Sequence, residues 1–238
     1  MKYIRHNASW IVLSKMKLPY HVDLIVFDLD GTLIDSREDL ANSANYVLNR
    51  LGLEELSVEI LSSFIGDGVY KLVERALDWQ TSPGRAYPGS VDEAVELFRA
   101  HYAEHLVDRT RLYPGVLETL NHFQGKKKAV VTNKPFDFAM SILNNLGIVE
   151  HFDVVLGGDS TTNRKPDPEP LEEVLTRLRI LKERAVIVGD SPQDIEMARR
   201  AGLLSIAVTY GLGQREELIK AEPDLFIEKL YDLANYLS

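Results

Sequence analysis

Short runs rich in apolar residues alternate with segments of helical periodicity along the second half of the chain. The apolar runs fall at 128–132, 154–156, 185–188 and 205–208. The helical segments fall at 116–123, 136–146, 169–179 and 193–201. Near-continuous apolar strands that alternate with helices are typical of a parallel sheet covered on both faces. Together with an earlier apolar run at 24–27, the pattern predicts an α/β fold with a Rossmann-like parallel-sheet core.

A block without strand signals separates the first apolar run from the rest of the predicted sheet. Between residues 36 and 109 the apolar positions follow helical spacing. Ser36 followed by Asp39 is typical of a helix start in which the two side chains cap the first turn. We therefore predict a sheet core at 21–34 and 112–238, with an inserted helical domain at 35–111 that closes over a site as a lid.

Residues 1–20 remain as an N-terminal extension. Lys2 and Arg5 precede a short apolar run at 10–13, as in the start of a signal peptide. Ser14 and Lys15 interrupt that run, and no small-residue cleavage pattern follows. We therefore expect no signal peptide, and we expect residues 1–17 to be dispensable for chemistry.

Composition narrows the classes of partner. The 238 residues carry a formal net charge of −9, which argues against nucleic acid because binding to its phosphates needs a basic face. The chain has no cysteine, so disulfides and thiolate metal sites are excluded. No apolar run reaches the ~20 residues that a membrane span needs. We expect a cytoplasmic protein without nucleic-acid or membrane partners; the oligomeric state stays open.

Two aspartates directly follow the first predicted strand, in the stretch Asp28-Leu29-Asp30-Gly31-Thr32. The side-chain period of a strand places both carboxylates on the same side. Carboxylates this close repel one another unless a cation or a shared proton relieves them. Packing does not require such a pair, whereas a site with one acid as nucleophile or metal ligand and the other as proton carrier does. The pair is therefore the first candidate for a catalytic site.

Three later regions carry polar residues where the predicted topology returns to the same edge of the sheet. They hold Thr132-Asn133, Lys165, and Asp190 with Asp194. Each has an ordinary reading alone: a hydroxyl that satisfies the backbone, a solvated lysine, an acid in the first turn of a helix. Open parallel sheets bind ligands at the carboxyl ends of their strands. Together these residues supply the nucleophile, hydroxyl, cation and carboxylates that a phosphate site needs.

With these residues, the sequence after Val22 resembles the haloacid dehalogenase superfamily of hydrolases. The family's four motifs are matched, in order, by Asp28-x-Asp30-Gly31-Thr32, Thr132, Lys165 and Gly189-Asp190-x-x-x-Asp194. The helical block resembles the family's small α-helical cap domain. Five further stretches are similar to bacterial phosphoglycolate phosphatases: Ile65-Gly66-Asp67-Gly68, Thr132-Asn133-Lys134-Pro135, Gly157-Gly158-Asp159, Arg164-Lys165-Pro166-Asp167-Pro168 and Thr209-Tyr210-Gly211.

The resemblance and the chemistry of the residues together imply catalytic roles. Asp28 is expected to attack phosphorus and form an aspartyl-phosphate. Asp30 is expected to protonate the leaving alkoxide and then to take a proton from the attacking water. Lys165 offsets the charge that phosphate brings to a site rich in carboxylates. The reaction that these roles describe is hydrolysis of a small phosphate ester, with 2-phosphoglycolate as the expected substrate.

The same resemblance implies Mg²⁺ as cofactor and a set of binding residues. Asp28, the backbone carbonyl of Asp30, and Asp190 are the expected ligands, because Mg²⁺ is a hard cation that prefers oxygen. Asp194 supports them by orienting a water or the catalytic lysine. The phosphoryl oxygens are expected to be held by the Thr132 side chain and by the amides of Leu29 and Asn133.

In the cap domain, Gly66 and Arg75 are the candidate substrate contacts. Gly66, with Gly68, would let the backbone approach a small substrate, although both glycines also suit ordinary helix connections. Arg75 has the geometry to bind a carboxylate through two bonds, although an arginine on a helix is more often solvated or ion-paired.

Other reactions of the same fold stay as alternatives. Relatives that cleave carbon–halogen bonds lack an acid at the position of Asp30, so its presence favours phosphoester chemistry. Phosphoglucomutases of this cap type usually have Gly-Val or Ala-Val in place of Gly31-Thr32. The alternatives are a pyrophosphatase, a sugar-phosphate phosphatase or phosphoglucomutase of the same fold, and a non-catalytic binding module.

Overall fold

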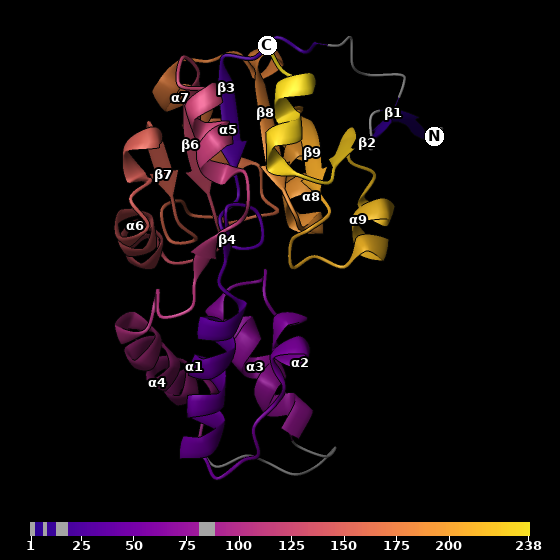
Figure 1. Ribbon diagram of the computed structural model, residues 1–238. Coiled ribbons are helices and arrows are strands. Elements are labelled where there is room, and N and C mark those ends of the chain that lie inside the picture. Colours follow the sequence, from indigo (N-terminus) through magenta and orange to yellow (C-terminus); the bar gives the residue numbers. More distant parts are fainter. Residues whose placement is uncertain (1–2, 7–8, 13–18, 81–88) are drawn as a thin grey trace. The chain divides into compact units, whose positions relative to one another are not determined.

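The computed structural model describes residues 3–6, 9–12, 19–80 and 89–238. The chain divides into two compact units (Figure 1). The sheet unit contains the chain up to Ile34 together with Leu112–Ser238, and the helical unit contains Asp35–Arg111.

An eight-stranded sheet forms the centre of the sheet unit, in the order β1-β2-β10-β9-β8-β3-β6-β7. Its six parallel strands are β10 (Leu225–Ile227), β9 (Leu204–Val208), β8 (Ala185–Gly189), β3 (Leu24–Phe27), β6 (Lys127–Val131) and β7 (Val154–Leu156). The central strand β3 is fully buried because every residue in it is apolar and both faces are covered. The predicted α/β fold with a parallel-sheet core is confirmed.

The sheet also contains strands that the sequence analysis did not expect. Strand β10 follows helix α9 (Arg215–Ala221) and pairs with β9. Strands β1 (Tyr3–His6) and β2 (Ser9–Val12) pair with each other in antiparallel fashion, and β2 pairs with β10. The expected extension at 1–20 thus supplies two strands to the sheet, while its residues 1–2, 7–8 and 13–18 lie outside the described residues.

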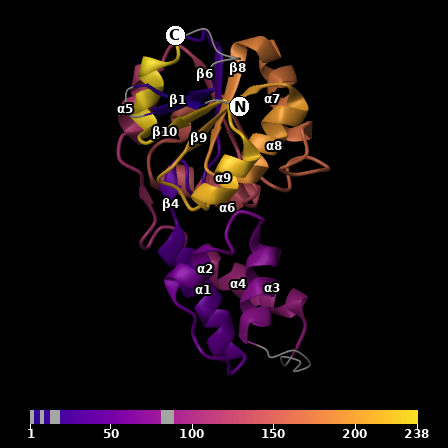
Figure 2. The same ribbon diagram turned by 90° about the vertical axis from the view of Figure 1, so that its right-hand side faces the viewer.

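Helices cover both faces of the sheet, as Figure 2 shows. On one face, α7 (Glu169–Leu178) and α8 (Pro192–Ala201) form an apolar cluster with alternate residues of the strands, among them Leu24, Val26 and Ile187. Helix α5 (Val116–His122) and the 3₁₀ helix η3 (Leu230–Asn235) lie on the opposite face. The remaining elements are α6 (Phe136–Asn145), η1 (Val149–His151) and η2 (Lys182–Arg184).

The register of the parallel strands brings their carboxyl ends together. Phe27 at the end of β3 lies opposite Val130 of β6 and Val188 of β8. The residues that directly follow these three strands therefore emerge at one edge of the sheet. These are Asp28, Thr132 and Asp190.

The helical unit consists of α1 (Arg37–Arg50), α2 (Val58–Ser62), α3 (Val69–Gln80) and α4 (Val91–Glu104). Helix α1 packs against the other three, and α3 packs against α4. The segments that lead into and out of the insertion, β4 (Ile34–Asp35) and β5 (Arg111–Leu112), pair as a two-stranded sheet. Among the helices described, none is long and apolar enough to span a bilayer.

The expected cap at the start of α1 is wrong. Ser36 occupies the position before the helix but makes no side-chain bond to its first turn. The Asp39 carboxylate instead accepts hydrogen bonds from the amides of Arg109 and Thr110 and from the Thr110 hydroxyl, at 2.8 to 3.0 Å. Asp39 therefore ties the start of the insertion to its end, a partnership that local sequence cannot reveal.

Candidate active site

Asp28 is placed by the central strand and by a turn that needs glycine. Its amide donates to the carbonyl of Val188 on the neighbouring strand, at 2.9 Å. Gly31 then turns the chain with a φ of 85°, a conformation that L side chains rarely adopt. A Cβ on Gly31 would come within 2.1 Å of an Asp190 carboxylate oxygen. The glycine therefore lets this loop pass directly beside Asp190.

Lys165 lies between two carboxylates at this edge. Its Nζ is 2.6 Å from Asp28 Oδ1 and 2.8 Å from Asp194 Oδ1. All three side chains are buried. Although burial disfavours an ammonium, the charges of Asp194 and Asp28 raise the pKa of Lys165 above its usual value. The lysine is therefore a permanent cation at the site.

Asp28, Asp190 and Asp194 form a buried carboxylate cluster, each offering an oxygen within 4.8 Å of the others. Burial, followed by the charge of Asp194, raises the pKa of Asp28 well above its usual range, and Lys165 offsets this in part. The same two causes raise the pKa of Asp190 to about 6. Among the described residues, Lys165 is the cation in contact with the cluster, so the three carboxylates and this ammonium carry a net charge of −2 when all are ionised. Oxygen ligands with this charge and spacing fit a divalent cation.

The Asp190 side chain is held by three donors. Its Oδ2 accepts from the amides of Leu212 and Gly213, at 2.7 and 3.0 Å, and its Oδ1 accepts from the Thr32 hydroxyl, at 3.2 Å. A Cβ on Gly211 would come within 2.4 Å of Asp190 Cβ and of the Gly31 carbonyl oxygen. The loop after β9 thus fixes one carboxylate of the cluster, and the sequence analysis missed this role.

Asp194 is fixed from its own helix. Its Oδ2 accepts from the amide and the hydroxyl of Ser191, at 3.1 and 2.6 Å, in a capping arrangement at the start of α8. Its Oδ1 faces Lys165. Asp194 therefore both caps α8 and pairs with the buried lysine.

Asp30 stands apart from the carboxylate cluster and has a different cation. The Nζ of Lys134 is 2.9 Å from Asp30 Oδ1. The Lys134 side chain is 3% exposed and the Asp30 side chain 14% exposed. In the sequence, Lys134 stands out only as part of a family motif, because a lysine three residues beyond a strand carries no signal of its own.

Thr132, Asn133 and Leu29 lie at the same edge. Thr132 Oγ1 accepts from the amide of Lys134, at 3.2 Å, and Asn133 Nδ2 donates to the carbonyl of Lys165, at 3.3 Å. The Leu29 carbonyl accepts from the amide of Leu33, at 2.9 Å, which closes the turn after β3. Their expected contacts with phosphoryl oxygens stay predictions.

Gly66 and Arg75 belong to the helical unit, and their surroundings are described within it. Gly66 has a φ of 121° and open space where a Cβ would lie. Arg75 forms an ion pair with Asp67 and donates to the carbonyl of Phe64, at 3.3 Å. The alternative reading of Arg75 as an ion-paired helical residue describes these contacts, and a substrate role for either residue stays a prediction.

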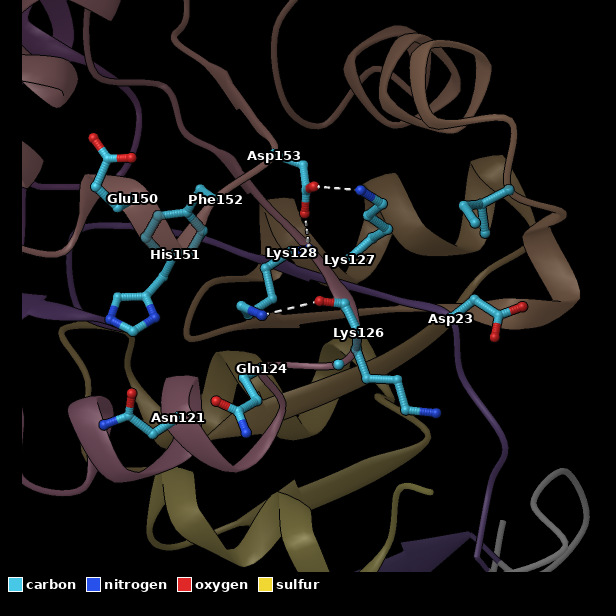
Figure 3. Close-up of a pocket in the computed structure, with 12 residues that line it drawn as sticks. Asp23, Asn121, Gln124, Lys126, Lys127, Lys128, Glu150, His151, Phe152 and Asp153 are labelled. Atoms are coloured by element: carbon cyan, nitrogen blue, oxygen red, sulfur yellow. Dashed lines mark hydrogen bonds and ion pairs between the residues drawn. The ribbon is translucent and has the colours of Figure 1, made fainter.

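A separate cavity of about 540 Å³ lies at the amino ends of the strands, on the opposite edge (Figure 3). Its lining carries equal numbers of basic and acidic residues: Lys126, Lys127 and Lys128, and Asp23, Glu150 and Asp153. Lys127 Nζ lies 2.7 Å from Asp153, and Lys128 Nζ donates to the carbonyls of Phe123 and Lys126, at 2.8 and 2.9 Å. This cavity therefore lacks the unbalanced charge that marks the carboxylate cluster.

Similarity to known proteins extends over most of the chain. Residues 25–208 match the family model described as haloacid dehalogenase-like hydrolase. The chain is 36% identical over 219 residues to the phosphoglycolate phosphatase of Nitrosospira multiformis, covering 91% of this chain and 96% of that protein. It is 38% identical over 226 residues to the phosphoglycolate phosphatase of Salmonella typhimurium, covering 88% and 90% respectively. The structure is similar to that of a predicted phosphoglycolate phosphatase from Haemophilus somnus, with a TM-score of 0.85, 34% identity, and 90% and 96% of the two chains covered.

Proposed function

We propose that this chain, which belongs to the haloacid dehalogenase-like hydrolase family and is a phosphoric monoester hydrolase, acts on 2-phosphoglycolate. The proposed reaction releases glycolate and phosphate and uses Mg²⁺. The relatives described above support the substrate by their names. The observation that carries the chemistry is the arrangement of the two aspartates after β3. Each is paired with a different buried lysine, so that one can act on phosphorus and the other on a proton.

Asp28 is the proposed nucleophile. Its carboxylate attacks phosphorus, the bond from phosphorus to the leaving oxygen breaks, and an aspartyl-phosphate forms. Lys165, 2.6 Å from this carboxylate, keeps it oriented and offsets the negative charge that the phosphate brings. Because Lys165 also contacts Asp194, the cation stays in place while Asp28 reacts.

Asp30 is the proposed acid and base. In the first step its proton passes to the leaving alkoxide, which departs as an alcohol. In the second step the resulting carboxylate takes a proton from the water that attacks the aspartyl-phosphate, and inorganic phosphate is released. Asp30 ends the cycle protonated, as it began. Its greater exposure than Asp28 suits a group that must reach both the leaving oxygen and water.

The carboxylate cluster is the proposed Mg²⁺ site, with Asp28 and Asp190 as side-chain ligands and the Asp30 carbonyl as a third protein ligand. When bound, the ion neutralises the cluster's net charge and polarises the phosphoryl oxygens. The Leu212 and Gly213 amides keep the Asp190 carboxylate in place for this purpose. The Asp194 carboxylate keeps Lys165 beside the nucleophile.

A panel assay tests the proposal. We would measure phosphate release from 2-phosphoglycolate, several sugar phosphates, p-nitrophenyl phosphate and pyrophosphate, with Mg²⁺ or with EDTA, for the native protein and for Asp28→Asn. We expect metal-dependent release that is fastest with 2-phosphoglycolate and is lost in the variant. A sugar phosphate or pyrophosphate as the best substrate would overturn the substrate assignment but leave the mechanism. Absence of release from every compound by folded, Mg²⁺-loaded protein would favour a non-catalytic binding module.

A further inference from the structure

Lys134 is the second buried lysine of the site, and its own part in the reaction follows from its ion pair with Asp30. Strands β3 and β6 are direct neighbours, so the loops that follow them are adjacent, and Asp30 and Lys134 come from these two loops. The distance of 2.9 Å joins Lys134 Nζ to Asp30 Oδ1.

The backbone that carries Lys134 is fixed on both sides. Its amide donates to Thr132 Oγ1 at 3.2 Å, and its carbonyl accepts from the Gly158 amide at 2.8 Å. A Cβ on Gly158 would come within 2.5 Å of the Asn133 carbonyl oxygen, so the two loops are in close contact there. The lysine side chain therefore extends from a rigid base, and its ammonium has a defined position.

Burying a lysine at 3% exposure is costly unless the ammonium has a specific partner. The carboxylate cluster already has Lys165 in contact with Asp28 and Asp194. Lys134 instead contacts the aspartate that stands outside the cluster. The two cations thus divide the carboxylates between the nucleophile and the proton carrier.

A general acid must be held close to the atom that it protonates, because displacement of a catalytic group by about 1 Å can cost about 100-fold in rate. A cation on a rigid base limits the rotation of an aspartate side chain that it contacts. We propose that Lys134 is a positioning residue, whose ammonium holds the Asp30 carboxyl group where the leaving oxygen arrives. This inference rests on the proposed function, in which Asp30 transfers that proton.

Comparison of two leaving groups separates a positioning role of Lys134 from a purely structural one. An alkoxide needs a proton as it departs, whereas p-nitrophenolate is a stable anion near neutral pH and needs none. The second step is common to both substrates, so the comparison uses kcat/KM, which reports the steps up to formation of the aspartyl-phosphate. If Lys134 acts through Asp30, Lys134→Met should lower kcat/KM on 2-phosphoglycolate by about 10-fold or more and kcat/KM on p-nitrophenyl phosphate by less than about 3-fold. Asp30→Asn should show the same preference with a larger loss, and Lys134→Met/Asp30→Asn should be no slower than Asp30→Asn alone.

Lys127→Met is the matched control, because Lys127 lies at the opposite end of the same strand in an exposed ion pair with Asp153 (Figure 3). It should leave both rates unchanged. Lys134→Gln carries the same prediction as Lys134→Met and serves if the methionine variant does not fold.

Equal losses on the two substrates, additive losses in the double variant, or native rates in folded Lys134 variants would each overturn the role of Lys134. These outcomes are distinct from failure of the proposed function, since they require that the native protein hydrolyses 2-phosphoglycolate. If the native protein releases phosphate from no alkyl phosphate, both proposals fail.

Discussion

Replacement of Lys165 by methionine tests whether the carboxylate cluster depends on its single cation. The substitution keeps most of the side-chain length and removes the charge. It leaves Asp28 and Asp194 facing each other without the ammonium that lies 2.6 and 2.8 Å from their oxygens. Asp190 stays within 4.8 Å of both, so three buried carboxylates then lack any counter-charge in the cluster.

The expected cost follows from these distances. At an effective dielectric constant of about 20, unit charges at such separations attract by about 6 kcal/mol. Desolvation of the buried charges offsets much of this attraction, and removal of one partner of a buried pair typically costs about 3–5 kcal/mol. For a chain of this length, each kcal/mol lowers the melting temperature by about 2–4 °C. Lys165→Met should therefore lower the Tm by about 6–20 °C.

The decrease in Tm caused by Lys165→Met should depend on pH. Loss of Lys165 raises the pKa of Asp28 further, because the lysine lowers it in the native protein. A carboxyl group whose pKa is higher in the folded than in the unfolded state takes up a proton on folding. Such a carboxyl group therefore destabilises the folded state more as pH rises. The difference in Tm between native protein and variant should be largest near pH 8 and smaller near pH 5.

Thermal unfolding followed by circular dichroism in EDTA measures this difference at both pH values. Lys127→Met is the control for loss of a lysine, and it should change the free energy of unfolding by less than about 1 kcal/mol because its ion pair is exposed. A folded Lys165→Met protein with a Tm within about 2 °C of the control, or with a loss that is the same at both pH values, would refute the electrostatic account of the cluster.

Three more predictions concern the metal, the loop after β9 and the ends of the insertion. The increase in Tm that Mg²⁺ causes should be full near pH 8 and should shrink as pH falls through the pKa of Asp190, which is about 6, because protons compete with the ion; a shift that does not depend on pH would contradict this. Gly211→Ala should weaken the stabilisation by Mg²⁺ and lower kcat by about 10-fold or more, since its Cβ would lie 2.4 Å from the Cβ of Asp190. Gly125→Ala is the control, because a Cβ there would meet open space, and it should leave both the Mg²⁺ stabilisation measured by calorimetry and kcat unchanged. Asp39→Ala should lower the free energy of urea unfolding by about 2–4 kcal/mol, because the amides of Arg109 and Thr110 would lose their buried acceptor; an unchanged midpoint would show that these bonds contribute little.

The sequence predicted the parallel strands best where each is a fully apolar run between helices, as with β3 and β8. Strand β10 was missed because three apolar residues after Asp224 are too few to separate from a loop or a helix end. The pairing of β2 could not be predicted without β10, since an isolated apolar run in the extension does not identify its partner strand. Local signals were thus sufficient for long buried strands and insufficient for short ones at the edge.

The carboxylates of the candidate site could be named from the sequence because their residue types are unusual at strand ends. Their partners could not be named in the same way. The amides of Leu212 and Gly213 belong to any residue type, so their role as donors to Asp190 has no compositional signal. Asp39 has a capping residue's position in sequence, yet it bonds to a segment about 70 residues away. Contacts made through the backbone or across long separations need the fold itself.

The two short strands at the ends of the insertion have an evolutionary consequence. Within the sheet unit, the chain leaves after Leu33 and returns at Tyr113, and the Tyr113 amide donates to the Leu33 carbonyl at 3.0 Å. An insertion whose ends are this close can be lengthened, shortened or exchanged for another fold without a change in the path of the surrounding chain. Asp28, Asp30, Lys134, Lys165 and Asp190 all lie outside it. Selection can therefore recombine new insertions with an unchanged set of reacting groups, and diversify one without disturbing the other.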